Sequence, residues 1–148
     1  NQRIFPDPKD PGRLTKLLDS LGGADLCVGG IGINGHLAFN EPKKEMSTAE
    51  FSALTARVLE ISPETRTANA IGDLNGAIED MPRYAITIGM HEILGAKRVR
   101  IGVFRQWHRA VVRRAACGEA GSQFPASLLQ NHPDAMILAN DVASERAV

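Results

Sequence analysis

The 148-residue sequence predicts an α/β fold, with a mostly parallel sheet flanked by layers of helices. Short apolar or β-branched runs alternate along the chain with segments of helical periodicity, which is typical of this class. The run 26–31 shows no polar alternation, as expected of a strand buried on both faces of a parallel sheet. No repeat or change of composition divides the chain, so we expect a single domain over residues 1–148.

Local signals predict the individual elements. Leucines at helical spacing predict a helix over residues 11–21, which two glycines end. Ser62 followed by Pro63 predicts the start of another helix. The polar segment 43–52 is open between a mobile lid and a plain surface connection. Strands are predicted over 26–31, 56–61, 84–88, 99–104 and 135–138, and further helices over 106–117 and 125–131.

Residues 32–42 read Gly-Ile-Asn-Gly-His-Leu-Ala-Phe-Asn-Glu-Pro and directly follow the first predicted strand. Ligands of open α/β sheets bind outside the carboxyl ends of the strands, and glycines let a loop turn with positive φ. His36 is the side chain here that titrates near neutrality, and Glu41 is close enough in sequence to orient it. The sequence therefore predicts an active-site loop, exposed at the edge of the sheet.

The segment 25–42 resembles the signature of the glucosamine-6-phosphate deaminase (isomerase) family. In that family a strand leads into a Gly-x-Gly-x-[Asp/Asn]-Gly-His-x-x-Phe-Asn-Glu-Pro loop. The related 6-phosphogluconolactonases share the Gly-His part, but Asn40, Glu41 and Pro42 favour the deaminase branch. The resemblance continues at 65–69, 82–89 and 125–130 and so covers nearly the whole chain. It implies a Rossmann-like fold of the deaminase/phosphogluconolactonase type.

The resemblance implies an enzyme that converts an amino-sugar 6-phosphate, such as glucosamine or galactosamine 6-phosphate, into the ketose 6-phosphate and ammonia. This is an aldose–ketose isomerisation with deamination, placed in the hydrolase class. By resemblance, His36 moves the ring-opening proton, Glu41 sets the tautomer of His36, and Asn34 orients the assembly. No cofactor is required, because the carbonyl of the substrate serves as the electron sink. The sugar contacts are expected at the glycines Gly30, Gly32 and Gly35.

The phosphate site is expected in the basic turn that follows the strand 99–104. Family members usually hold the sugar phosphate there with a Lys, and in this sequence Arg109 is the first candidate and Arg105 the second. Family members also commonly carry an Arg two residues beyond an Ala-Asn pair, where this chain has Ile71. These departures motivate one alternative, a non-catalytic sugar-phosphate-binding module. The other alternative is a 6-phosphogluconolactonase-like hydrolase with His36 as the base for water.

The resemblance further implies that the chain is the C-terminal portion of a longer deaminase domain. A phosphate loop and the base of the isomerisation are then expected upstream of residue 1. Asp73 and Glu79 are the reserve candidates for that base.

The amino-acid composition restricts the kinds of molecule that the protein is expected to bind. The 17 basic and 17 acidic residues balance, so no overall field attracts nucleic acid or an anionic membrane. No apolar run approaches the roughly 20 residues of a membrane span, and no signal peptide is visible. Cys27 and Cys117 are predicted to be buried free thiols, consistent with the cytoplasm. Four separated histidines predict no metal site. The expected partner is a small sugar phosphate, and a homo-oligomer is left open.

Overall fold

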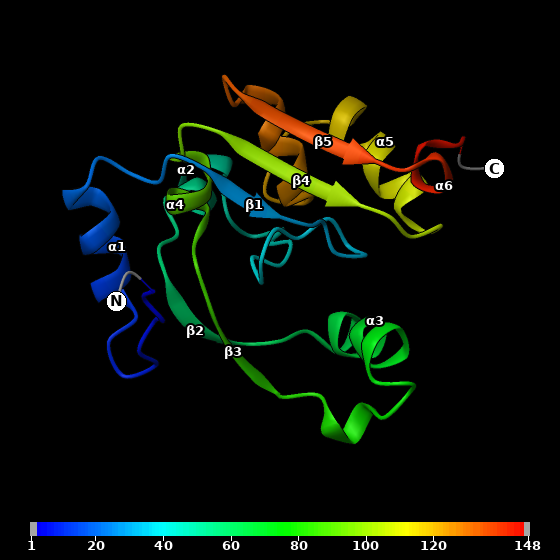
Figure 1. Cartoon of the computed structure of the whole chain (residues 1–148), viewed down its shortest axis with the longest axis horizontal. Coiled ribbons are helices and arrows are strands. Elements are labelled where there is room, and N and C mark those ends of the chain that lie inside the picture. Colours follow the sequence, from blue (N-terminus) through cyan, green and yellow to red (C-terminus); the bar gives the residue numbers. More distant parts are fainter. Residues whose placement is uncertain (1–2, 147–148) are drawn as a thin grey trace.

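A computed structural model describes residues 3–146 of the chain. A parallel sheet packs against helices on one face, and a two-stranded ribbon that carries another helix lies beneath it (Figure 1). In chain order the elements are α1 (Gly12–Ser20), β1 (Cys27–Gly29), α2 (Thr48–Ser52), β2 (Arg57–Glu60), α3 (Pro63–Asp73), η1 (Ile78–Asp80), β3 (Tyr84–Thr87), α4 (Met90–Leu94), β4 (Val99–Val103), α5 (His108–Cys117), η2 (Pro125–Asn131), β5 (Ala135–Ala139) and α6 (Asp141–Ser144).

The parallel sheet has the order β1–β4–β5, with β4 in the centre. Cys27 aligns with Val99 on one side of β4, and Ala135 aligns with Val99 on the other. Along β4, buried Val99, Ile101 and Val103 alternate with half-buried residues. Because side chains of a strand alternate between the two faces, these three share the face that the helices cover. The strands predicted over 99–104 and 135–138 and the α/β class are confirmed, and the strand predicted over 26–31 is present but limited to Cys27–Gly29.

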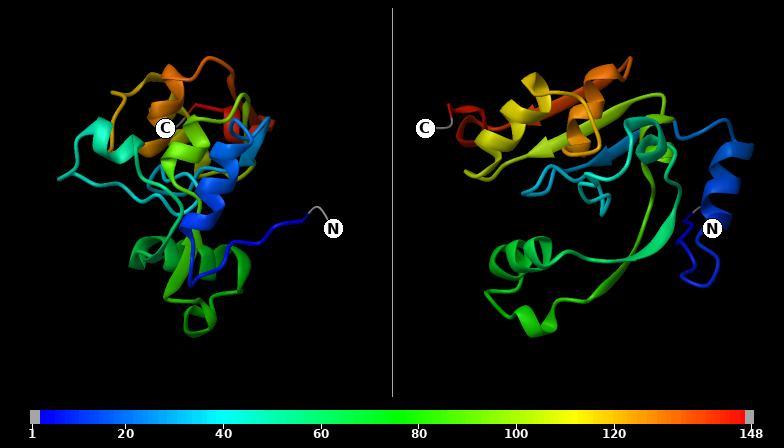
Figure 2. Two further views of the ribbon diagram at one scale, coloured as in Figure 1. Left: turned by 90° about the vertical axis from the view of Figure 1, so that its left-hand side faces the viewer. Right: turned by 180° about the vertical axis from the view of Figure 1, so that it is seen from behind.

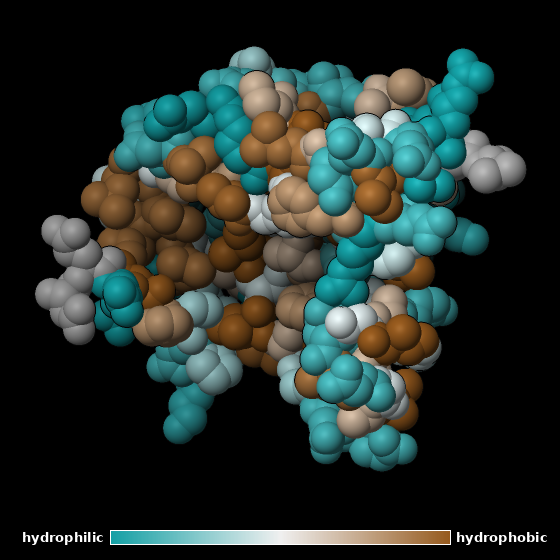
Figure 3. All heavy atoms as spheres, turned by 45° about the vertical axis from the view of Figure 1, so that its right-hand side comes forward, coloured by the Kyte–Doolittle hydropathy of each residue, from teal (hydrophilic) through white to brown (hydrophobic). Residues whose placement is uncertain are grey.

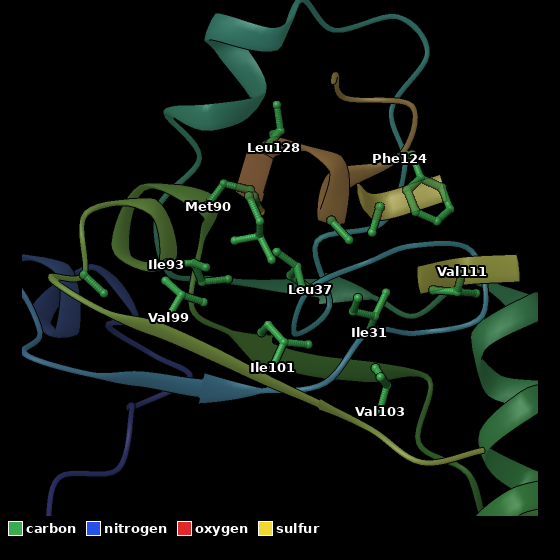
Figure 4. Close-up of a cluster of buried hydrophobic side chains, with 14 of the residues drawn as sticks. Ile31, Leu37, Met90, Ile93, Val99, Ile101, Val103, Val111, Phe124 and Leu128 are labelled. Atoms are coloured by element: carbon green, nitrogen blue, oxygen red, sulfur yellow. The ribbon is translucent and has the colours of Figure 1, made fainter. Parts of the chain in front are cut away.

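The core lies between this sheet face and the helices (Figure 4). Full burial of an aliphatic or aromatic side chain contributes about 1.5–3 kcal/mol, so this cluster is the main source of stability. Its larger members are Ile31, Leu37, Phe51, Met90, Ile93, Val99, Ile101, Val103, Val111, Phe124, Leu128 and Leu129. Ile31 and Leu37 come from the Gly-rich loop after β1, so this loop is part of the core.

The opposite face of the sheet is open within residues 3–146. Val28 is 72% exposed, and Met136 and Leu138 are each 49% exposed. The prediction that the run 26–31 is buried on both faces is therefore wrong. Its apolar composition is real, but β1 is an edge strand that pairs only with β4, and Val28 stays largely exposed.

The strands β2 and β3 form a separate antiparallel ribbon, with Arg57 opposite Thr87 and Glu60 opposite Tyr84. Both strands were predicted, but they do not join the parallel sheet. They extend beneath it and carry α3 and η1 at their far end (Figures 1 and 2). This arrangement places α3 below the carboxyl ends of β1 and β4. It therefore brings a second layer of side chains to the predicted active-site edge.

The segment 43–52 contains the short helix α2. Ser47 and Glu50 form a capping box at its start, and Phe51 is fully buried. Of the two alternatives for this segment, the structure favours the surface connection, because a buried aromatic side chain anchors it.

The two cysteines are free, with Cys27 half-buried and Cys117 exposed. The expectation of a buried thiol is wrong for Cys117, which ends α5 on its solvent side. None of the helices within residues 3–146 is long and apolar enough to cross a membrane. The same residues hold no group of three or more His, Cys, Asp or Glu side chains that could bind a metal ion.

Candidate active site

The loop after β1 folds back on itself. Leu37 forms short antiparallel bridges with Ile31 and with Asn40. Asn40 is fully buried, and its amide nitrogen donates hydrogen bonds of 3.0 Å to the carbonyl oxygens of Leu37 and Ile88. The expectation of an exposed loop is therefore wrong. Its apolar side chains join the core and hold its polar side chains in fixed positions.

Two glycines are required by the tight path of this loop. A Cβ at position 32 would lie 1.9 Å from the His36 ring, so the imidazole packs directly on the Gly32 backbone. Gly35 has a φ of 86°, which side chains rarely allow, and a Cβ there would lie 2.4 Å from the Phe124 ring. These glycines let the loop seat the imidazole close to the end of β1.

Asn34, His36 and Glu41 form one hydrogen-bonded cluster. Nδ1 of His36 lies 2.8 Å from Oδ1 of Asn34 and 3.7 Å from Oε2 of Glu41. Nδ2 of Asn34 donates a hydrogen bond of 2.5 Å to the same oxygen of Glu41. Asn34 thus bridges the imidazole and the carboxylate. The structure brings the three predicted catalytic residues together, and their roles in a reaction remain predictions.

The hydrogen bonds indicate the tautomer of His36. The oxygen of an amide can only accept, so Nδ1 carries the hydrogen and Nε2 carries a lone pair. Within residues 3–146, Nε2 makes no hydrogen bond. Burial lowers the pKa of His36 below its ordinary value of 6.5, and the Glu41 carboxylate opposes this by raising it. The imidazole is therefore neutral at neutral pH and can accept a proton at Nε2.

A cavity of about 490 Å³ opens beside His36, lined by the carboxyl ends of β1 and β4 and by α3. Figure 3 shows the hollow between the part that holds the sheet and the part that holds α3. Of the predicted sugar contacts, Gly30 and Gly32 line this cavity and Gly35 does not. Asn34 and Glu41 instead line a separate, more polar hollow. His36 is the member of the cluster that faces the cavity.

Thr65 is a site residue that the sequence analysis missed. It lies in the first turn of α3, is fully buried, and places its hydroxyl 3.4 Å from Nδ1 of His36. Its segment was recognised as family-like, but no role was assigned to it. The signal in the sequence was a polar residue three positions after the helix cap Ser62. The structure adds that this helix lies under the loop, at the end of the ribbon.

His108 was also missed, because it lies in the basic turn after the strand 99–104, where only the arginines were considered. It is buried, and its Nε2 donates a 3.1 Å hydrogen bond to the carbonyl oxygen of Ile31. Its Nδ1 accepts a 2.9 Å hydrogen bond from the backbone nitrogen of Arg105. Burial lowers the pKa of His108, which fits a neutral ring with one donor and one acceptor. His108 therefore joins the loop after β4 to the loop after β1.

The two arginines expected to hold phosphate differ in position. Arg105 lines the cavity and forms an ion pair of 2.6 Å with Asp73. Arg109 donates to the carbonyl oxygen of Val142 at 2.8 Å, forms an ion pair with Glu145, and does not line the cavity. The geometry therefore favours Arg105 over Arg109 as a ligand-binding residue.

Comparison with known proteins identifies the relatives. No model of a known protein family matches the chain. A glucosamine-6-phosphate deaminase from Bacillus velezensis is 38% identical over 133 residues, which are 90% of this chain and 52% of that protein. Glucosamine-6-phosphate deaminase 1 from Bacillus subtilis is 35% identical over 132 residues, which are 89% of this chain and 51% of that protein. This chain is related to the glucosamine-6-phosphate deaminases. It spans about half the length of the curated relatives it matches.

The solved structures agree with this family relationship. A monomeric glucosamine-6-phosphate deaminase superposes with a TM-score of 0.80 and 31% identity, over 97% of this chain and 56% of that one. The 6-phosphogluconolactonase from Trypanosoma brucei superposes with a TM-score of 0.63 and 16% identity, over 97% of this chain and 56% of that one. At that identity the second likeness shows the fold alone. The predicted deaminase/phosphogluconolactonase fold is thus confirmed.

Proposed function

We propose that the protein carrying this chain is an amino-sugar phosphate deaminase that converts glucosamine 6-phosphate, or galactosamine 6-phosphate, into the ketose 6-phosphate and ammonia. The observation that carries the proposal is the cluster of Asn34, His36 and Glu41, with His36 facing a cavity at the carboxyl end of β1. The kinship with glucosamine-6-phosphate deaminases, over about half their length, supports the same reaction.

The geometry suits His36 to ring opening. A neutral imidazole takes the proton of the anomeric hydroxyl at Nε2 and returns it to the ring oxygen as the bond from C1 to that oxygen breaks. Glu41, 3.7 Å from Nδ1, stabilises the imidazolium that forms in between. Asn34 accepts from Nδ1 and so keeps Nε2 free for the sugar. The glycine backbones at positions 30 and 32 allow the sugar to approach this edge closely.

Arg105 is the residue we propose for the phosphate, with Arg109 as the second candidate. A guanidinium matches the oxygens of a phosphate in geometry and charge, and Arg105 brings one to the cavity wall. We also propose that the enzyme belongs to the hydrolase class and that it is cytoplasmic. The two free thiols support the cytoplasmic location. We propose no partner beyond the sugar phosphate.

Ammonia release from glucosamine 6-phosphate by the protein that carries this chain tests the proposal. His36→Gln and Glu41→Gln should each lower turnover by roughly a hundredfold, the usual scale for a positioned acid–base group. His91→Gln is the matched control, because His91 is exposed, contacts Asp19 and lies outside the His36 cavity. Near-normal turnover in both site variants would rule out the assigned roles. Hydrolysis of phosphogluconolactone without ammonia release would favour the lactonase alternative, and sugar-phosphate binding without turnover the binding module.

A further inference from the structure

The cavity of the proposed deaminase site carries one cation and one carboxylate. Among the described residues that line it, Arg105 is the one arginine or lysine and Asp73 the one aspartate or glutamate. The two side chains form an ion pair of 2.6 Å. Arg105 comes from the loop after β4, whereas Asp73 is the last residue of α3. The pair therefore links the loop after β4 to the end of α3 across the cavity. Figures 1 and 2 show α3 beneath the sheet.

Gly72 provides the seat for the guanidinium. A Cβ at position 72 would lie 1.9 Å from Nη1 of Arg105, so the guanidinium rests directly on the backbone of the last turn of α3. The negative end of a helix dipole favours a cation at this position. Ile71, next to this seat, is 70% exposed and offers no charge of its own.

His108 fixes the backbone from which Arg105 reaches across. It accepts a hydrogen bond from the backbone nitrogen of Arg105 and donates to the carbonyl oxygen of Ile31. The loop is thereby held against the end of β1, and the arginine side chain extends from it to Asp73. The ion pair itself is about half exposed on both sides, and ion pairs of such exposure are weak. An anion that enters the cavity can therefore replace Asp73 as the partner of Arg105.

We propose that Gly72 and Asp73 set the anion affinity of this cavity: Gly72 seats Arg105, and Asp73 is an internal competitor that a ligand phosphate displaces. This inference rests on the proposed function only for the identity of the natural ligand. In the ligand-free protein Asp73 neutralises Arg105 and ties α3 to the sheet. When a phosphate binds, Arg105 turns to it and the tie to α3 is released.

Inorganic phosphate is the probe, and its binding to the protein that carries this chain is followed by NMR titration. Asp73→Asn should tighten phosphate binding about two- to fivefold, the range that corresponds to loss of a weak competing ion pair. Arg105→Met should weaken it by at least about tenfold. In the Arg105→Met background, Asp73→Asn should have no further effect. Asp25→Asn is the matched control, because it removes an exposed 2.7 Å ion pair with Lys97 outside the cavity.

Gly72→Ala separates this role from a structural one. Alanine favours a helix over glycine, so the substitution should not weaken α3, yet its methyl group occupies the seat of the guanidinium. We expect weaker phosphate binding together with unchanged or higher stability. Unchanged phosphate affinity in Asp73→Asn, or no phosphate-dependent shift in the wild type, overturns the inference. If phosphate binding follows the expected pattern but no ammonia is released from glucosamine 6-phosphate, the inference stands and the proposed function fails.

Discussion

The imidazole of His36 is subject to two opposing electrostatic effects. Burial disfavours its charged form and lowers its pKa, while the Glu41 carboxylate 3.7 Å away favours the charged form. Burial is the larger effect, so the neutral ring dominates in the folded protein. The neighbouring His108 is shifted in the same direction, also by burial. Both rings are therefore neutral in the folded protein at neutral pH, but only His36 keeps a ring nitrogen without a hydrogen bond within residues 3–146, since His108 uses both of its nitrogens.

These shifts predict a pH dependence of stability. A histidine whose pKa is lower in the folded than in the unfolded state stabilises the fold fully above its unfolded value of 6.5. That contribution is lost as the pH falls through the lowered pKa. The free energy of unfolding, measured in urea from about pH 7.5 to about pH 5, should therefore decrease. His36→Gln and His108→Gln should each flatten the decrease, and an identical slope in all three proteins would contradict this assignment.

The sequence correctly predicted which site residues lie together when those residues are close in the chain. Asn34, His36 and Glu41 sit in one loop, so their grouping is visible in the motif itself. Thr65 and His108 reach the same site from α3 and from the start of α5, which are distant in the chain. No local pattern encodes such contacts, because they depend on how the sheet and the ribbon are placed.

At the scale of elements, α3 connects the ribbon to the active-site loop. Ser62 accepts a 3.2 Å hydrogen bond from the backbone nitrogen of Thr65, and Pro63 occupies the first turn. The cap therefore fixes the turn from which the Thr65 hydroxyl approaches His36. Both cap signals were readable in the sequence. The antiparallel pairing of β2 with β3 was not, since short strands of either kind share the same composition.

Removing this cap should affect both stability and the site. Ser62→Ala should cost about 0.5–2 kcal/mol of the free energy of unfolding and shift the NMR signals of the His36 ring. Ser47→Ala is the matched control, because Ser47 caps α2 in the same way but lies outside the His36 cavity. We expect a similar stability loss there without a shift at His36. Equal shifts in the two variants would mean that the effect on His36 is a general loosening of the fold.

At the scale of the whole molecule, the parallel sheet is covered on one face within residues 3–146. The buried face carries Val99, Ile101 and Val103, and the open face carries Val28, with Met136 and Leu138 among its other apolar residues. Parallel sheets are normally covered on both faces, and contiguous exposed apolar surface favours association. The apolar runs in the sequence correctly located the strands, but composition does not report which face a neighbour covers.

This open face predicts how the 148-residue chain behaves in isolation. It should bind an apolar fluorescent dye and self-associate as its concentration rises, because Met136 and Leu138 on the edge strand β5 are half exposed on this face. A Met136→Thr and Leu138→Thr double variant should reduce both, while threonine keeps the β propensity of the strand. The melting temperature should change little, since neither side chain is buried. Val58→Thr, at a 44% exposed position on the ribbon, is the control. If Val58→Thr reduced dye binding as much as the double variant, the dye would be reporting exposed apolar side chains in general and not the open face of the sheet.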